Sequence, residues 1–249
     1  QNDERTAASS GNRISFTVSS EPNRTVLDTS DDATVSWKGT EKMGLFYVYR
    51  LSGSSSDVIQ SANLPYSASV ASANTLATFS GNAVWRENDE TSTQKFYIYY
   101  PYNAGNDAQR ITRILGTLPS AQEYDAAASE WDISAYDFMY ASQSNATYKG
   151  TINFSNLRHL FAILRLNISN STGKAVTIKS VTLSSEGGKI LAGSFQTHLG
   201  LGDQNSALPN TAITLGDNAQ GFTSTSSSVT TNVSNGTVAA GASIDVRMV

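Results

Sequence analysis

The chain has 249 residues, a formal net charge of −4, 15% charged residues and no cysteine. A chain of this length can bury one large β core or two modest ones. The slightly negative net charge gives no excess of basic residues that would favour nucleic-acid binding. The lack of cysteine excludes disulfides, thiolate metal sites and a cysteine nucleophile, and no apolar run approaches the roughly 20 residues that span a bilayer.

The first elements are a leader and two strands. Residues 1–12 are polar and without periodicity, which predicts a flexible leader. Ile14, Phe16 and Val18 alternate with Ser and Thr, and this period of two is typical of a strand with one buried face. Residues 43–51 (MGLFYVYRL) are apolar at both parities, so we expect a strand covered on both faces.

The middle of the chain contains further strands and one ambiguous region. Residues 76–79 and 83–85 are expected to be short strands around a hairpin-type turn at Ser80-Gly81-Asn82. Residues 96–100 (FYIYY) predict a buried aromatic strand that ends at Pro101. For residues 110–131 two alternatives stay open: a long ordered loop, or a short helix after Pro119 that starts with the capping-box sequence SAQE.

The second half again indicates strands. Ala162, Leu164, Leu166 and Ile168 fall on every second residue, so we expect them in the core, with the intervening Arg165 and Asn167 on the other face. Strand-like runs follow at residues 175–183 and 244–248. About ten short strands with turn-rich spacing predict two tandem antiparallel β-sandwiches. We place the leader at 1–12, the N-terminal sandwich at 13–155 and the C-terminal sandwich at 156–249, the second short enough to be incomplete.

No catalytic, cofactor-binding or metal-binding constellation emerges from the polar residues. The two histidines, His159 and His198, lie far apart and neither has a partner at i+4. The carboxylates at Asp28, Asp31 and Asp32 and those scattered over residues 123–137 lack the spacing of a calcium loop or a glycosidase pair. We interpret them as solvated turns and expect a protein that is not an enzyme.

The aromatic residues leave one alternative function open. Trp37, Trp85, Trp131 and the tyrosines of residues 97–102 could form a platform for sugars if their rings were exposed. Most of them lie within strand runs, where core packing is the commoner use. A surface glycan-binding lipoprotein therefore stands as the alternative to a structural protein.

Six blocks, in order, resemble the fimbrillin family, which comprises subunits and accessory proteins of type V pili in anaerobic Gram-negative bacteria. The blocks are ISFTV followed by NRT, VSWKGTEKMGLF, FYIYYPYN, LPSAQ, YDFMYASQ and FSNLRHLFAILRLNI. The resemblance implies two β-sandwiches of transthyretin-like topology and a non-enzymatic pilus subunit, or pilus-associated surface protein, that serves adhesion. Its expected partners are other pilus subunits and a ligand on a host or bacterial surface, with no cofactor and no nucleic acid.

The resemblance also implies how such a protein is processed. Family precursors are exported as lipoproteins to the outer membrane, and the sequence QNDE at residues 1–4 is similar to the acidic segment after the lipidated cysteine. Membrane contact would be through that N-terminal lipid anchor alone. Stalk subunits are cut after an arginine, for which Arg24 and Arg13 are the candidates. The cut releases a strand, here the one carrying Ile14, Phe16 and Val18, and a neighbouring subunit adds a strand in its place.

Overall fold

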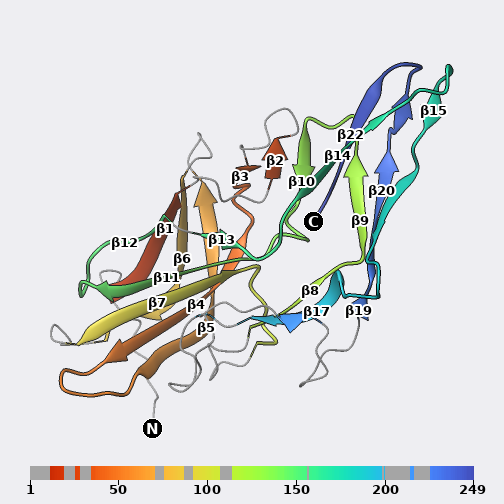
Figure 1. Cartoon of the computed structure of the whole chain (residues 1–249). Helices are drawn as coiled ribbons and strands as arrows, with labels where there is room; N and C mark the ends of the chain where they lie inside the picture. The colour runs from red at the N-terminus through yellow and green to blue at the C-terminus, as the bar shows by residue number, and fades with distance from the viewer. Residues whose placement is uncertain are drawn as a thin grey trace, which may run out of the picture.

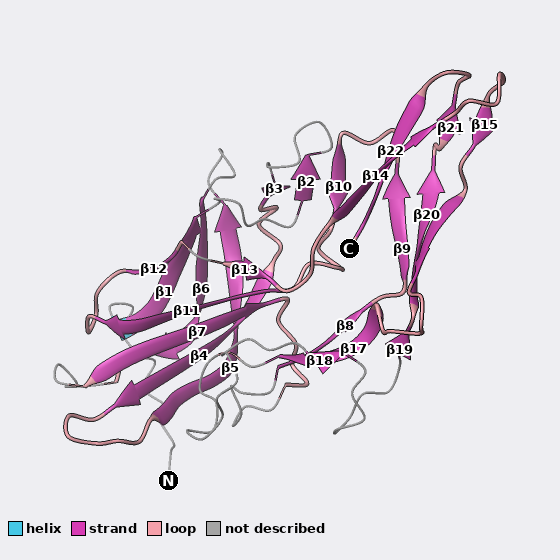
Figure 2. Ribbon diagram, viewed as in Figure 1, coloured by secondary structure: helices cyan, strands magenta, loops and turns pink. Residues whose placement is uncertain are grey.

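The computed structural model describes residues 12–19, 26–28, 35–70, 76–86, 92–106, 114–155, 157–197, 199, 214–215 and 225–249 (Figure 1). Within these ranges the chain consists of β-strands and connecting loops, with no α-helix (Figure 2). The prediction of an all-β fold is confirmed. In the same ranges, no helix is long and apolar enough to cross a membrane.

An eight-stranded sheet forms the N-terminal part of the molecule, in the order β12-β1-β6-β5-β4-β7-β11-β13. Parallel pairing occurs in this sheet between β1 and β12, and the other neighbours are antiparallel. The strands are β1 Arg13–Ser19, β4 Lys42–Arg50, β5 Val58–Val70, β6 Leu76–Val84, β7 Thr93–Tyr100, β11 Met139–Ala146, β12 Ile152–Phe154 and β13 Arg158–His159.

The long strand β5 joins two layers of this sheet. Its first part pairs with β4 up to Ser67, and its last part, from Ser67 to Val70, pairs with β6. Asn63 in the middle of β5 has a positive φ of 46°, and the register against β4 shifts on either side of Tyr47. The sheet therefore bends, and Figure 1 shows β1 and β6 running across the direction of β4 and β7. One large core fills the bend, built from alternate side chains of β1, β4, β6, β7, β11 and β12 together with Trp37 and Trp85.

Strand β4 is buried on both faces, as its sequence predicts. Met43, Leu45 and Tyr47 point into the large core, while Phe46 and Val48 belong to a second cluster on the opposite face. That second cluster contains Tyr97 and Tyr99 of β7 and is covered by Ile114 and Leu199. Segments outside the sheet therefore protect its second face from water.

The remaining strands form smaller sheets. A two-stranded sheet pairs β14 with β22, a second pairs β15 with β21, and two three-stranded sheets have the orders β16-β20-β9 and β10-β2-β3. Strand β17 pairs with β8, β18 and β19. The bounds are β2 Val26–Asp28, β3 Val35–Ser36, β8 Ile114–Leu118, β9 Ala121–Asp125, β10 Glu130–Asp132, β14 Leu164–Ser169, β15 Val176–Thr177, β16 Ser180–Ser184, β17 Ala192–Thr197, β18 Thr214–Leu215, β19 Thr225–Ser226, β20 Ser228–Ser234, β21 Thr237–Val238 and β22 Ser243–Met248.

Residues 114–132 connect the two halves of the chain. Strand β8 pairs antiparallel with β17, and β9 pairs parallel with β20, so both add to sheets of C-terminal strands. Strand β10 pairs instead with β2 near the N-terminus. The division between residues 155 and 156 stays a prediction, and the pairing of β8 and β9 crosses it. Neither a helix nor a long loop forms after Pro119, because β9 is completed by a partner far along the chain.

Two other details differ from the expectations. The segment around Gly81 is not a hairpin turn, because β6 runs through it without a break. A Cβ atom on Gly81 would lie 2.5 Å from the Tyr66 ring, so this glycine permits a close approach of that ring. On β14, Ile168 packs against a core cluster, but Leu164 is 38% exposed and Ala162 is exposed before the strand begins. The prediction that all four apolar residues enter the core is wrong: β22 pairs with β14 along its whole length, but of the four side chains only Ile168 packs against a core cluster.

Candidate functional site

Strand β1 occupies an interior position of the eight-stranded sheet. Its backbone pairs with β6 on one side and with β12 on the other, so that Phe16 lies opposite both Phe79 and Ile152. The Ile14, Phe16 and Val18 side chains, predicted to face the core, are buried with at most 1% of their surface exposed. The polar residues between them face the outer side, where the Thr17 hydroxyl contacts the Asn153 side chain.

Phe16 is the centre of an aromatic cluster. Its ring stacks on Tyr66 at 5.1 Å and on Phe79 at 5.3 Å, and it meets Phe154 edge-to-face at 5.2 Å. These three partners come from β5, β6 and β12, so one side chain of β1 holds three other strands together. Such aromatic pairs add about 0.5–1.5 kcal/mol each beyond the burial of their area.

In the sequence, one candidate cleavage point begins β1 and the other follows it. Arg13 is the first residue of the strand, is exposed, and donates a hydrogen bond from Nη1 to Asn82 Oδ1 at 3.0 Å. Arg24 falls outside the described residues. A hollow of about 260 Å³ borders β1 and is lined by Arg13, Ser15 and Thr17 among others. Part of the strand's outer surface is therefore open to solvent.

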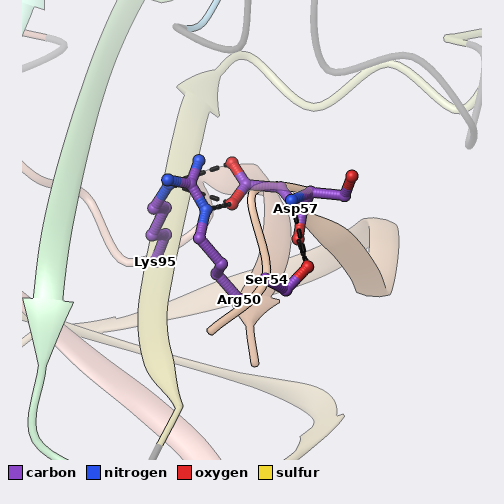
Figure 3. A network of polar contacts seen from close by, with 5 residues as sticks. Arg50, Ser54, Asp57 and Lys95 are labelled. Carbon is purple, nitrogen blue, oxygen red and sulfur yellow. Dashed lines mark hydrogen bonds and ion pairs between the residues drawn. The ribbon is translucent and has the colours of Figure 1, made fainter. Parts of the chain in front are cut away.

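A group of charged side chains closes the loop between β4 and β5. Asp57 Oδ1 accepts a hydrogen bond from Arg50 Nε at 2.6 Å, and Asp57 Oδ2 lies 2.9 Å from Lys95 Nζ (Figure 3). Burial by itself would raise the pKa of Asp57, but the hydrogen bonds from Arg50 and Lys95 outweigh this and hold the pKa below its ordinary value. The group ties the ends of β4, β5 and β7 together.

Of the two histidines, His159 lies within the residues that the structure describes. His159 lies in β13, where its Nδ1 is 2.6 Å from Asp137 Oδ1, and His198 falls outside the described residues. Asp137 is 5% exposed, and this burial raises its pKa even though His159 favours the charged form. The pair anchors β13 to the segment that leads into β11.

The acidic residues scattered over 123–137 serve structural contacts. Glu123 accepts a hydrogen bond from Asn232 at 2.7 Å, Asp125 accepts one from Asn235 at 2.8 Å, and Asp132 pairs with Lys38 at 2.9 Å. Asp28 lies in β2, and Asp31 and Asp32 fall outside the described residues. Within the described ranges no group of three histidine, cysteine or acidic side chains could hold a metal ion.

The tryptophans do not form an exposed platform. Trp37, Trp85 and Trp131 are 1%, 5% and 4% exposed, and each packs edge-to-face against other aromatic rings. The tyrosines at 97, 99 and 100 are also buried, whereas Tyr102 is half-buried. The structure thus contradicts a sugar platform made of exposed tryptophans, because these rings fill the space between the layers.

Comparison with known proteins places these features in a family. The sequence matches the family described as Fimbrillin-like over residues 24–239. Among solved structures, the chain is similar to a candidate cell adhesion protein from Bacteroides uniformis ATCC 8492, with a TM-score of 0.48 and 13% sequence identity. That alignment covers 95% of this chain and 75% of the other chain. A search of the curated proteins found no match.

Because the family match extends over most of its length, the chain belongs to the Fimbrillin-like family. This is a structural, non-enzymatic family, and the protein is accordingly of the pilus type, located at the cell surface.

Proposed function

We propose that this protein is a pilus subunit, or a pilus-associated surface protein, that assembles with other subunits by strand addition after β1 has left its sheet. The observation that carries the proposal is the place of β1, a strand close to the N-terminus that nevertheless lies between β6 and β12. Removal of an interior strand leaves two unpaired edges and an apolar groove, and both features favour the addition of a strand from another molecule.

The energy of burial favours a second strand in the groove that β1 would leave, compared with a groove that stays empty. Full burial of an apolar side chain of the size of Ile14, Phe16 or Val18 contributes about 1.5–3 kcal/mol. Loss of all three would also expose the rings of Tyr66, Phe79 and Phe154 that now surround Phe16. The groove would therefore be stable only when another apolar strand occupies it.

The geometry of the groove specifies the strand that would fit. Such a strand would pair antiparallel with β6 and parallel with β12, as β1 does. It would place three apolar side chains at alternate positions, with an aromatic ring in the place of Phe16. The polar positions between them would face outward, as Ser15 and Thr17 do.

Of the two candidate arginines, Arg24 is the one whose cleavage would free β1. A cut after Arg13 removes only residues 1–13 and leaves Ile14 and the rest of the strand joined to the chain. A cut after Arg24 separates all of β1 from residues 25–249. We therefore propose Arg24 as the processing site and Arg13 as its matched control.

Limited digestion with a trypsin-like protease tests this proposal. The wild-type chain and the variants Arg24→Gln and Arg13→Gln would be digested in parallel and followed by size-exclusion chromatography with light scattering. We expect the wild type and Arg13→Gln to form higher oligomers, while Arg24→Gln remains a monomer. A stable monomer after cleavage at Arg24, or assembly of Arg24→Gln, would overturn strand addition at this groove.

A synthetic peptide provides an independent measurement. A peptide of residues 13–19 added to the digested protein should refill the groove and suppress oligomers. The same peptide with Phe16→Ala should be a weaker competitor, because it cannot restore the aromatic cluster. Equal inhibition by both peptides would show that the Phe16 pocket does not select the incoming strand.

For the cellular protein we propose an N-terminal lipid anchor in the outer membrane, supported by the family resemblance of residues 1–4. The measurement is partition of the native protein between detergent and aqueous phases, with and without digestion near the N-terminus. Recovery in the aqueous phase before digestion would contradict the anchor without affecting the proposal on β1.

A further inference from the structure

A cavity of about 550 Å³ lies between the loop after β7 and the edge of the small sheet formed by β8 and β17. The loop contributes residues 101–104, β8 contributes residues 115–117, and β17 contributes Ser194 and Phe195, with Phe138 completing the wall. Its volume falls within the range of pockets that hold small ligands, and it is bordered by strands from separate sheets.

Among the residues that the structure describes, the lining combines hydroxyl and amide groups with aromatic rings and includes no charged side chain. Thr117 and Ser194 lie opposite each other in the β8–β17 pair, and their hydroxyl oxygens are 3.2 Å apart. Asn103 adds an amide, and Tyr102, Phe138 and Phe195 add rings. A charged ligand would lose hydration here without gaining an oppositely charged side chain, so the chemistry favours a neutral ligand.

Buried amides fix the loop that forms one wall. Asn63 Nδ2 donates to the carbonyl oxygens of Asn103 at 3.1 Å and Asn106 at 3.2 Å. Asn106 Nδ2 donates to the Tyr99 hydroxyl at 3.0 Å, and Asn106 Oδ1 accepts from the backbone N–H of Leu115 at 2.9 Å. Asn63 and Asn106 are both buried. This network joins β5, β7 and β8 to the loop, so the cavity is formed before any ligand binds.

Contacts between aromatic rings fix the apolar wall of the cavity, which includes Phe138 and Phe195. The Phe195 ring meets Phe138 edge-to-face at 4.7 Å and Phe161 at 5.1 Å. Gly116 makes room for this arrangement, because a Cβ atom there would lie 2.4 Å from Phe195 and 2.9 Å from Phe138. The Gly116–Phe195 pair and the neighbouring Thr117–Ser194 pair are successive in the ladder, so the ring packing fixes the strand positions that carry the two hydroxyls.

We propose that this cavity binds a neutral carbohydrate. A sugar has an apolar face of C–H groups, which suits the half-buried ring of Tyr102, and a rim of hydroxyls, which suits Asn103, Thr117 and Ser194. The site lies away from β1, so the inference does not depend on strand release, and it assigns a chemical class to the surface ligand of an adhesive protein.

An array of immobilised glycans, probed with the intact uncleaved chain, tests the inference. The array would carry neutral glycans ending in galactose, glucose, mannose, fucose or N-acetylhexosamine, beside sialylated and sulfated glycans. We expect saturable binding to a subset of the neutral glycans. Binding to none of them, or only to the acidic ones, would overturn the inference.

Variants then locate the binding, measured by calorimetry with the best neutral glycan as the probe. Tyr102→Ala and the double variant Thr117→Val/Ser194→Ala should each weaken binding about tenfold or more, and Tyr102→Phe should retain most of it because the ring remains. Tyr49→Ala, which removes a half-buried tyrosine on β4 beneath Arg86, is the matched control and should bind like the wild type. Thermal unfolding of each variant confirms that it is folded. Unchanged affinity in folded Tyr102→Ala and in the folded double variant would place the sugar elsewhere and overturn the proposed site.

Discussion

The hydroxyl group of Tyr66 donates a hydrogen bond to the main-chain carbonyl of Ile14 at 3.0 Å in the interior of the protein. A side chain of β5 thus holds the backbone of β1 directly, in addition to the ladders with β6 and β12. Departure of β1 would leave this buried hydroxyl without its acceptor. The Tyr66 hydroxyl therefore opposes the release of β1.

Replacement of Tyr66 by phenylalanine should loosen β1 while leaving the aromatic stacking on Phe16 in place. We expect a loss of about 1–3 kcal/mol in the free energy of unfolding, because the Ile14 carbonyl remains buried without its partner. Amide hydrogen exchange should accelerate in β1 more than in β4. If both strands exchange faster by the same factor, Tyr66 stabilises the whole sheet and not β1 in particular.

Gly44 controls the position of Tyr99 across the strand pair. A Cβ atom on Gly44 would lie 2.0 Å from the Tyr99 ring, which rests on the glycine backbone of the opposite strand. Gly44→Ala should therefore displace Tyr99 and disturb its hydrogen bonds with Asn63 and Asn106. We expect destabilisation by about 1–3 kcal/mol, as for overpacked sites, together with weaker binding at the cavity. Gly53→Ala is a contrasting substitution at an exposed turn: no atom lies within 4 Å of the new Cβ, so any loss of stability there reports the strain of its positive φ of 79° and not overpacking.

The stabilising contribution of Asp57 should be lost in acid. Its pKa is lowered in the folded state, so its contribution to stability is present above the pKa of about 3.9 in the unfolded chain and is lost as the pH falls through the folded-state value. The difference in unfolding free energy between the wild type and Asp57→Asn should shrink as the pH falls from about 5 to about 2. Glu130→Gln, on an exposed side chain, serves as the control. A constant difference across this range would contradict the assigned role of Arg50 and Lys95.

The stabilising contribution of Asp137 should instead be lost as the pH rises. Its pKa is raised in the folded state, so the stabilising contribution of its neutral form is complete below about pH 4 and is lost as the pH rises through the folded-state value. The variant Asp137→Asn should gain stability relative to the wild type as the pH rises from about 3.5 to about 5.5, below the range in which a free histidine titrates. Chemical denaturation at several pH values measures this trend, and an unchanged or declining gain would refute it.

Gln122 fastens the last residue of the sequence to β9. Its buried amide donates from Nε2 to the Val249 carbonyl at 2.8 Å and accepts at Oε1 from the Val249 N–H at 2.9 Å. Gln122→Leu should remove both bonds and leave the part-buried main-chain groups of Val249 without these partners, which should lower the free energy of unfolding by about 1 kcal/mol. We expect faster proteolysis near the C-terminus of this variant. Protection equal to that of the wild type would mean that the pairing of β22 with β14 is sufficient.

The sequence predicts those features that depend on neighbouring residues. The alternation of Ile14, Phe16 and Val18 identifies β1 and its buried face, and the apolar run around Phe46 identifies a strand covered on both sides. Features that depend on distant partners were missed. Nothing local shows that residues 121–125 form a strand, because their partner is β20, or that Gly81 serves a tyrosine ring instead of a turn.

The two candidate sites, strand β1 and the cavity beside β8, also differ in how far the sequence predicts them. The strand proposed for release carries a clear periodic signal. The cavity does not, because Asn103, Thr117 and Ser194 come from three segments without a shared motif and meet only in the folded chain. The group FYIYYPYN contained Tyr102 and Asn103, and the break at Pro101 was the one signal that these residues leave the strand and enter a loop.

The parallel pairing of β9 with β20 bears on the order in which the molecule can fold. Glu123 and Asn232, which face each other in this pair, are separated by 109 positions in the sequence. During synthesis from the N-terminus, β9 emerges long before its partner exists, so the sheet that it shares cannot form until β20 at Ser228–Ser234 has been made. Closing such a large loop is entropically costly, and contacts of this range are associated with folding in milliseconds to seconds. The last third of the chain should therefore set the folding rate of residues that lie in its first half.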